Sequence, residues 1–157
     1  DMFPIDRPSH VSELWPADQL DRLLATSEIV VLCVPLNDQT RGMLHSGTLA
    51  TMKPGSLLIN VARGPVVDES ALVVAILSGH LAGAGLDVTE IEPLPKDSPL
   101  WEMENVIITP HVGAQSARRV RDTTNLFCDN LRRYQAGLPL RNLVDKQLGF
   151  PVRREIG

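Results

Sequence analysis

Four short apolar runs alternate along the chain with segments that carry apolar residues at helical spacing. The runs are residues 29–34 (IVVLCV), 56–62 (SLLINVA), 82–88 (AGAGLDV) and 106–109 (VIIT). They are almost continuously apolar rather than alternating, which is typical of strands in a parallel sheet that is covered on both faces. The pattern therefore predicts an α/β fold with a parallel sheet and flanking helices.

The segments between and after these runs predict the helices. They are residues 17–27, 45–52 and 68–80, and the last is residues 116–137. In the third segment we expect Asp68 to be the N-cap and Gly79 the C-cap. The last segment predicts one long amphipathic helix, because its apolar residues Val120, Phe127, Leu131 and Tyr134 recur at helical spacing.

Composition and charge exclude several classes of protein. The 157 residues are enough for one domain, and the 15 Lys and Arg against 19 Asp and Glu give a net charge of −4 without blocks of either sign. This charge argues against a nucleic-acid or anionic-membrane partner. No apolar run approaches the length of a membrane span, and no signal-peptide pattern opens the chain, so we expect a cytoplasmic protein. Cys33 and Cys128 lack the spacing of a metal site or redox motif, and we expect free thiols and no metal.

Charged and polar residues gather where the apolar runs end. Pro35 follows the first run, Arg63 and Gly64 follow the second, Asp87, Glu90 and Glu92 accompany the third, and Pro110 and His111 follow the fourth. Open α/β sheets bind ligands outside the carboxyl ends of their strands. Arg63, Glu92 or His111 alone is compatible with a surface or core role. All three at successive strand ends predict a shared site.

Three signatures occur in order along the chain, namely VARGPVVDESAL, SGHLAGAGLDVTEIEPLP and NVIITPHVGAQS. With them, the chain from about Leu20 to about Gly149 closely resembles the NAD-dependent D-2-hydroxyacid dehydrogenases, a family that includes glycerate, phosphoglycerate and glyoxylate/hydroxypyruvate reductases. The resemblance implies a doubly wound, Rossmann-like domain. It also implies an enzyme that transfers a hydride between NAD and a small D-2-hydroxy or 2-oxo acid.

The resemblance assigns catalytic roles to three residues. It implies that Arg63 holds the carboxylate and carbonyl of the substrate, that His111 exchanges the hydroxyl proton, and that Glu92 pairs with His111. Glu92 is preferred to Glu90 because it directly precedes Pro93, as the family's glutamate precedes a proline. The chemistry suits these roles, since a guanidinium presents paired donors to a carboxylate and an imidazole both donates and accepts protons.

The resemblance also implies a set of cofactor-binding residues. Val34 and Pro35 would lie against the adenosine half of NAD; Val61, Ala62, Arg63 and Asp87 would face the nicotinamide; His111, Gly113 and Ala114 would flank it; and Asp1 would hold the ribose. NADP is not excluded, because the choice depends on the residue that ends the second strand of such folds. A turn or capping role is the alternative for Asp87. Thr89 stands where the family usually has an aromatic residue.

Two parts of the family pattern do not occur in the 157 residues: the GxGxxG segment that receives the pyrophosphate, and the N-terminal substrate domain. We therefore interpret residues 1–157 as an incomplete NAD-binding domain with a C-terminal helix and tail, belonging to a longer, homodimeric enzyme. The first two strands would be absent, and we expect their places to lie between residues 29–34 and 56–62. The sheet would then be incomplete or completed by exchange between protomers, and the isolated chain would be inactive.

Two other functions fit parts of the sequence. The chain could be a non-catalytic module that senses a dinucleotide or binds a partner while it keeps the same residues. It could also come from a formate or phosphite dehydrogenase, although the resemblance implies that formate enzymes usually replace the glutamate found here as Glu92. Binding of NADH without reduction of any 2-oxo acid would favour the sensing module, and turnover of formate would favour the formate enzyme.

Overall fold

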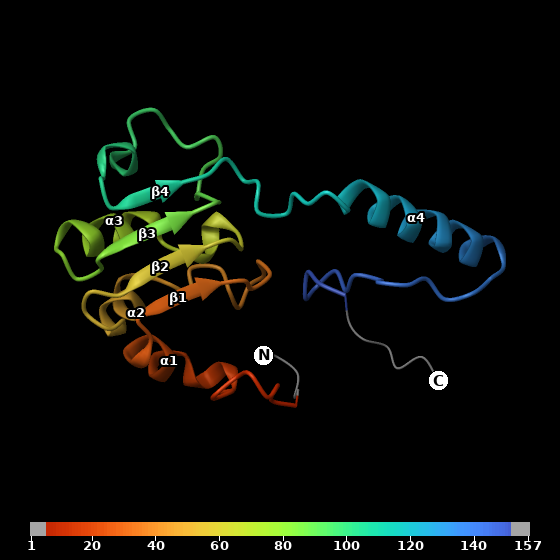
Figure 1. The fold of residues 1–157 in the computed structure, drawn as a ribbon, viewed down its shortest axis with the longest axis horizontal. Helices are drawn as coiled ribbons and strands as arrows, with labels where there is room; N and C mark the ends of the chain where they lie inside the picture. The colour runs from red at the N-terminus through yellow and green to blue at the C-terminus, as the bar shows by residue number, and fades with distance from the viewer. Residues whose placement is uncertain (1–5, 152–157) are drawn as a thin grey trace.

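The fold is a four-stranded parallel sheet with helices packed on one face (Figure 1). It was determined as a computed structural model that describes residues 6–151, so the predicted ribose ligand Asp1 lies outside the described residues. The strands are β1 (Ile29–Leu32), β2 (Leu57–Asn60), β3 (Gly83–Leu86) and β4 (Val106–Ile108). All four predicted runs form strands, and the α/β prediction is confirmed.

The order of the strands corrects one expectation. The sheet runs β1-β2-β3-β4, and β1 pairs directly with β2, with Ile29 opposite Leu57 and Leu32 opposite Asn60. The expectation that the sheet of this chain is incomplete at this point, or completed by exchange between protomers, therefore does not hold: residues 29–32 pair directly with residues 57–60. Consecutive parallel strands joined by a helix usually become neighbours, and here that pairing satisfies the backbone groups between β1 and β2.

Three helices cover one face of the sheet, namely α1 (Leu20–Thr26), α2 (Ser46–Thr51) and α3 (Glu69–Leu77). The ring nitrogen Nδ1 of His45 caps α2 by accepting from Gly47 N at 3.1 Å. Asp68 caps α3 as predicted, since its Oδ1 accepts from Ala71 N at 3.0 Å. The C-cap of α3 is Ser78, and the predicted Gly79 is the next residue, in the left-handed conformation with φ of 75°.

The hydrophobic core lies between the sheet and these helices. Its fully buried side chains come from every layer: Leu24, Leu44, Leu49, Met52, Leu58, Leu72, Leu81 and Leu100. The other face of the sheet is apolar and open, since Ile29, Val31 and Ile107 keep 58%, 54% and 71% of their surface exposed. Figure 1 looks onto this face, with α2 and α3 behind the strands. No helix of residues 6–151 covers it, so the expectation of strands covered on both faces does not hold within the described chain.

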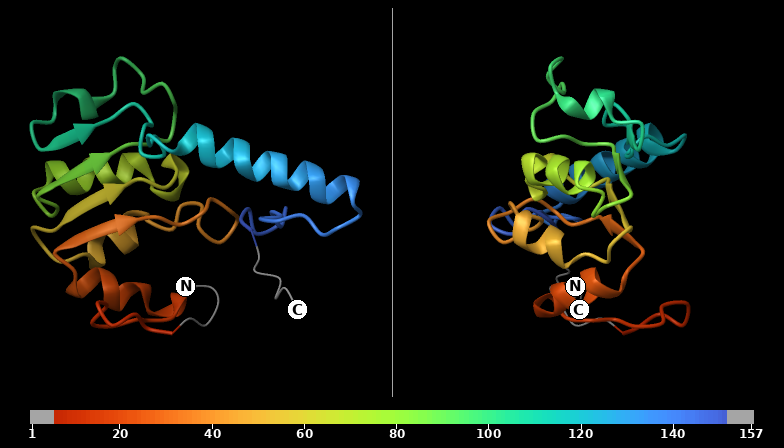
Figure 2. Two further views of the ribbon diagram at one scale, coloured as in Figure 1. Left: turned by 45° about the vertical axis from the view of Figure 1, so that its right-hand side comes forward. Right: turned by 90° about the vertical axis from the view of Figure 1, so that its left-hand side faces the viewer.

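The predicted long helix forms α4 (Arg119–Gln135), which extends away from the sheet (Figures 1 and 2). It has no buried residue, and its predicted apolar stripe of Val120, Phe127, Leu131 and Tyr134 is exposed along its length. The tail then folds back, and Asn37 Nδ2 after β1 donates to Leu148 O at 3.2 Å. None of the helices in the described part of the chain is both long and apolar enough to cross a membrane. Two short 3₁₀ turns, Gly64–Val66 and Pro99–Glu102, complete the connections between strands, and a third (Ala17–Gln19) precedes α1.

Candidate active site

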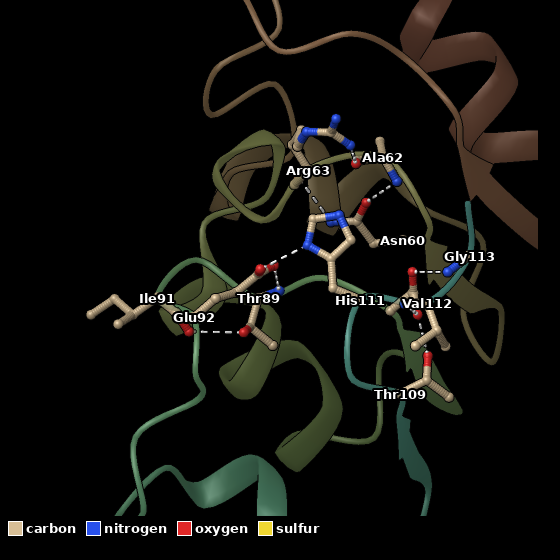
Figure 3. Close-up of polar contacts among 11 residues, drawn as sticks. Asn60, Ala62, Arg63, Thr89, Ile91, Glu92, Thr109, His111, Val112 and Gly113 are labelled. Carbon is tan, nitrogen blue, oxygen red and sulfur yellow. Dashed lines mark hydrogen bonds and ion pairs between the residues drawn. The ribbon is translucent and has the colours of Figure 1, made fainter. Parts of the chain in front are cut away.

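The predicted site residues follow strands of the sheet at one edge. Arg63 lies in the turn after β2, Asp87 directly follows β3, and His111 lies beyond β4. Because the strands are parallel, their carboxyl ends meet at the same edge, and Figure 3 shows Arg63, Glu92 and His111 gathered there. The topology therefore brings together residues that are far apart in the sequence.

Glu92 and His111 form a direct pair. Nδ1 of His111 lies 2.8 Å from Oε2 of Glu92, and Oε1 of the same carboxylate accepts from Thr89 N at 3.3 Å (Figure 3). An ionised carboxylate only accepts hydrogen bonds, so Nδ1 is the protonated nitrogen and donates to it. The second ring nitrogen, Nε2, has no hydrogen-bond partner among residues 6–151 and stays available for proton transfer.

The backbone of His111 adopts an unusual conformation. Its φ is 54°, in the left-handed region, and its N–H donates to Asp87 O at 2.9 Å and to Thr109 O at 3.0 Å. Residues other than glycine occupy this region at a cost of about 1–3 kcal/mol, and such residues cluster at functional sites. The conformation persists because the surrounding contacts fix it. In this conformation the imidazole lies against Glu92, with Nδ1 2.8 Å from Oε2 (Figure 3).

Asp87 is the most heavily bonded carboxylate of this edge. Its Oδ1 accepts from Thr109 Oγ1 at 2.6 Å and from Val112 N at 2.8 Å, and its Oδ2 accepts from Gly113 N at 2.7 Å. The hydroxyl of Thr109, followed by the two backbone N–H groups, holds the pKa of Asp87 below its ordinary value. Asp87 is therefore an ionised acceptor at neutral pH.

This arrangement allows a test of whether the edge fits a nicotinamide. A carboxylate has about four acceptor positions, and protein donors occupy three of those of Asp87. The remaining position lies on Oδ2 and suits one N–H of a carboxamide, whereas a group that only accepts hydrogen bonds would be repelled. The residue keeps 8% of its surface exposed, so it is buried but still reached by solvent. The donor and acceptor chemistry of the edge thus fits the predicted cofactor.

Arg63 lies at the same rim but forms no hydrogen bond or ion pair with Glu92 or His111. Its exposed guanidinium donates from Nη1 to Ala62 O at 2.6 Å, and no acidic side chain of residues 6–151 lies within ion-pair distance of it (Figure 3). The buried Asn60 shapes this turn, because its Oδ1 accepts from Ala62 N at 3.0 Å and its Nδ2 donates to Arg63 O at 3.2 Å. The remaining guanidinium donors are free to bind an anion.

Sequence reasoning missed the contact that joins the Arg63 turn to the Glu92 loop. Gly64 is buried, and a Cβ at this position would lie 1.8 Å from Thr89 O and 2.6 Å from Glu90 N. Glu90 N in turn donates to Oε2 of Glu69 at 3.0 Å. Only glycine permits so close an approach of two backbones. The signal available in the sequence was a glycine directly after a strand-end arginine.

The other predicted cofactor residues follow the same strands. Val34 and Pro35 are half-buried after β1, Val61 is 44% exposed, Ala62 is buried, and Gly113 and Ala114 are exposed beyond β4. Trp101 lies in the loop after β3, where its Nε1 donates to Pro95 O at 2.9 Å. Both cysteines are free thiols, and among the described residues no cluster of three His, Cys, Asp or Glu side chains could hold a metal.

Comparisons with known proteins identify the family of the chain. Residues 4–113 match the family model of the D-isomer specific 2-hydroxyacid dehydrogenase NAD-binding domain. Glyoxylate/hydroxypyruvate reductase B of Pectobacterium carotovorum is 42% identical over 129 residues, which are 82% of this chain and 40% of the reductase. The chain therefore spans less than half the length of this relative.

Solved structures show the same likeness. A D-isomer specific 2-hydroxyacid dehydrogenase of Xanthobacter autotrophicus Py2 in complex with NADPH and MES superposes with a TM-score of 0.80 at 48% identity, over 85% of this chain and 55% of that one. An NADPH-dependent glyoxylate/hydroxypyruvate reductase of Sinorhizobium meliloti in complex with NADP and sulfate also has a TM-score of 0.80, at 35% identity over 87% of this chain and 44% of that one. The chain belongs to the D-isomer specific 2-hydroxyacid dehydrogenase family, and its matched part is the NAD-binding domain.

Proposed function

We propose that this chain is part of an oxidoreductase that interconverts a small 2-oxo acid and the corresponding D-2-hydroxy acid with a nicotinamide cofactor. The observation that carries the proposal is the 2.8 Å contact between His111 Nδ1 and Glu92 Oε2, at the sheet edge that also presents Arg63 and Asp87. The similar reductases and dehydrogenases support the reaction class. NAD is the expected cofactor, and the NADP and NADPH bound in two similar structures keep NADP open.

His111 would act as the acid and base of this reaction. With Nδ1 bonded to Glu92, Nε2 would face the reacting oxygen, donate a proton when the ketone is reduced and accept one when the alcohol is oxidised. Glu92 stabilises the imidazolium form and fixes the plane of the ring. The nicotinamide held at this edge would supply the hydride for reduction of the carbonyl carbon and would take it back in oxidation.

Arg63 would bind the carboxylate of the substrate. In this structure it donates to the neighbouring carbonyl of Ala62 and has no acidic partner among the described residues, so a substrate anion need not displace a protein carboxylate. A guanidinium matches a carboxylate with two parallel N–H donors and can also reach a carbonyl oxygen. Asp87 would accept the carboxamide N–H at its one remaining acceptor position. The other predicted cofactor-binding residues, Val34, Pro35, Val61, Ala62, Gly113 and Ala114, would line the same edge.

Turnover by the longer enzyme that carries this sequence tests the proposal. We expect reduction of glyoxylate or hydroxypyruvate with NADH or NADPH, a fall in kcat on the order of 10²- to 10⁴-fold for His111→Gln, and a fall in kcat/KM of about 10- to 100-fold for Arg63→Lys. Arg119→Lys, on the exposed surface of α4, is the matched control and should keep the wild-type rate. If the longer protein bound the cofactor but reduced no 2-oxo acid, the proposal would be wrong and a non-catalytic dinucleotide-sensing module would be favoured.

The pH dependence tests the pairing of Glu92 with His111. Glu92→Gln removes the charge that stabilises the imidazolium, so the pH optimum for reduction should move to lower pH while the fold stays intact. Glu90→Gln is the control, because Glu90 contacts Glu69 through its backbone N–H and its carboxylate is not the partner of His111. An unchanged optimum in Glu92→Gln would remove Glu92 from the mechanism.

We further infer that the enzyme is a cytoplasmic homodimer. The open apolar face of the sheet and the exposed stripe of α4 support an association, since apolar patches of this kind mark interaction surfaces. The free thiols of Cys33 and Cys128 suit a reducing compartment. Analytical sedimentation of the longer enzyme tests the dimer. Fractionation of its host cells tests the cytoplasmic location.

A further inference from the structure

We propose that Asp87 is a positioning residue, which holds the loop of residues 109–113 so that His111 reaches Glu92 before any cofactor binds. The inference rests on the proposed function for the role of His111. It goes beyond the expected contact of Asp87 with a carboxamide, since it gives the carboxylate a task within the protein itself.

The hydrogen bonds of Asp87 enclose His111 on both sides. Thr109 Oγ1 precedes the histidine, Val112 N and Gly113 N follow it, and all three donate to this one carboxylate within 2.6–2.8 Å. The backbone carbonyl of Asp87 accepts from the N–H of His111 itself at 2.9 Å. One residue directly after β3 therefore accepts from four donors of residues 109–113, namely the Thr109 hydroxyl and the backbone N–H groups of His111, Val112 and Gly113.

This clamp accounts for the left-handed backbone of His111. A φ of 54° is not what a free loop would choose for a histidine, so external contacts must hold it. No other side chain of the described residues bonds the backbone of residues 111–113. The imidazole then needs no rearrangement to meet Glu92 at 2.8 Å.

Gly113 is the second part of the clamp. A Cβ on this residue would lie 2.8 Å from Oδ2 of Asp87, too close for a carboxylate that already bonds the Gly113 N–H. A side chain at this position would push the carboxylate away from the Gly113 N–H. The exposure of Gly113 shows that core packing is not what limits the side chain here.

The test uses the 157-residue chain without cofactor, where a role limited to binding the cofactor would have no effect. Asp87→Asn keeps the size of the side chain but turns an N–H group toward one of the loop donors. We expect the amide protons of Val112 and Gly113 to exchange with solvent at least about tenfold faster. We also expect the NMR signal of the hydrogen-bonded Nδ1 proton of His111, assigned with His111→Gln, to disappear.

Three further variants make the result decisive. Asp68→Asn is the matched control: it removes a carboxylate that also bonds a hydroxyl and a backbone N–H, at the start of α3, and should leave the His111 signal unchanged. Thr109→Val removes one donor and Gly113→Ala displaces the carboxylate, so both should weaken the signal even if Asp87→Asn does not fold.

Two results would overturn the proposal. One is an Asp87→Asn chain whose Val112 and Gly113 exchange, and whose His111 signal, match the wild type. The other, if that variant does not fold, is an unchanged signal in both Thr109→Val and Gly113→Ala. Failure of the proposed function has a different signature, because it would appear as absent turnover in the longer enzyme while the cofactor-free measurements still showed the clamp.

Discussion

Two regions of the molecule contain similar apolar side chains but differ in how far they bury them. One is the body, which is the sheet with α1, α2 and α3, and the other is the arm, which is α4 with the tail that follows it. In the body, Leu24, Leu58 and Leu72 are at most 1% exposed, because strands and helices meet face to face. In α4 no residue is buried, and Phe127 and Leu131 remain 66% and 48% exposed. An apolar stripe stabilises a fold only where a second surface covers it. The body therefore has its own core, whereas the arm presents a surface without a cover.

The largest expected effect separates the two regions directly. Leu58→Ala, at the centre of β2, should lower the free energy of unfolding by about 2–5 kcal/mol, because it leaves a cavity in the core. Leu131→Ala in α4 should change it by less than about 0.5 kcal/mol. Urea denaturation followed by circular dichroism measures both. Equal losses in the two variants would show that α4 packs against the body in solution.

The next effect concerns the contact between the Arg63 turn and the Glu92 loop. Gly64→Ala should destabilise the body by about 1–3 kcal/mol, because the new Cβ overlaps the Thr89 carbonyl. Gly47→Ala in α2 is the control, since its Cβ would meet no backbone atom and only the exposed ring of His45, the N-cap of the helix. Thermal unfolding of the two variants checks the prediction, and a Gly64→Ala chain as stable as wild type would refute the close approach.

Acid should weaken the body through its bonded carboxylates. The pKa values of Asp68 and Asp87 lie below their ordinary values, because hydroxyl and backbone donors bond the ionised forms. Such groups add stability above the unfolded-state pKa, and this contribution is lost as the pH falls through the folded-state pKa. The urea concentration at the unfolding midpoint should therefore decrease once the pH is lowered below about 4. This loss on acidification should be smaller in the Asp68→Asn and Asp87→Asn variants than in the wild type. A loss as large as the wild type's in both variants would contradict this origin.

The smallest effect is expected in the arm. Arg141 binds the Asp129 carboxylate at 3.1 Å, and its backbone N–H donates to Asn130 Oδ1 at 2.8 Å, which fastens the tail to α4. The ion pair is exposed, so Arg141→Ala should cost about 0–1 kcal/mol, and less at high salt. Hydrogen exchange of the tail amides would detect the loosening. A change in the body amides would show instead that the arm and the body unfold together.

The sequence by itself determined the elements and the residues brought to the edge of the sheet. Continuous apolar runs predicted all four strands, helical spacing predicted α4, and Asp68 was recognised as a cap. These features depend on residues close together in the chain, so local pattern is sufficient for them. Placing Arg63, Glu92 and His111 at one edge required only the rule that parallel strands share their carboxyl ends.

Only the tertiary structure decided which surfaces meet. It paired β1 directly with β2, left one face of the sheet open, and brought Gly64 against Thr89. It also bonded Asp87 to a loop that follows the next strand, and set His111 in the left-handed conformation. Contacts of this kind join residues far apart in the chain. Their partners are chosen by packing and by the need to satisfy buried polar groups, which no local pattern records.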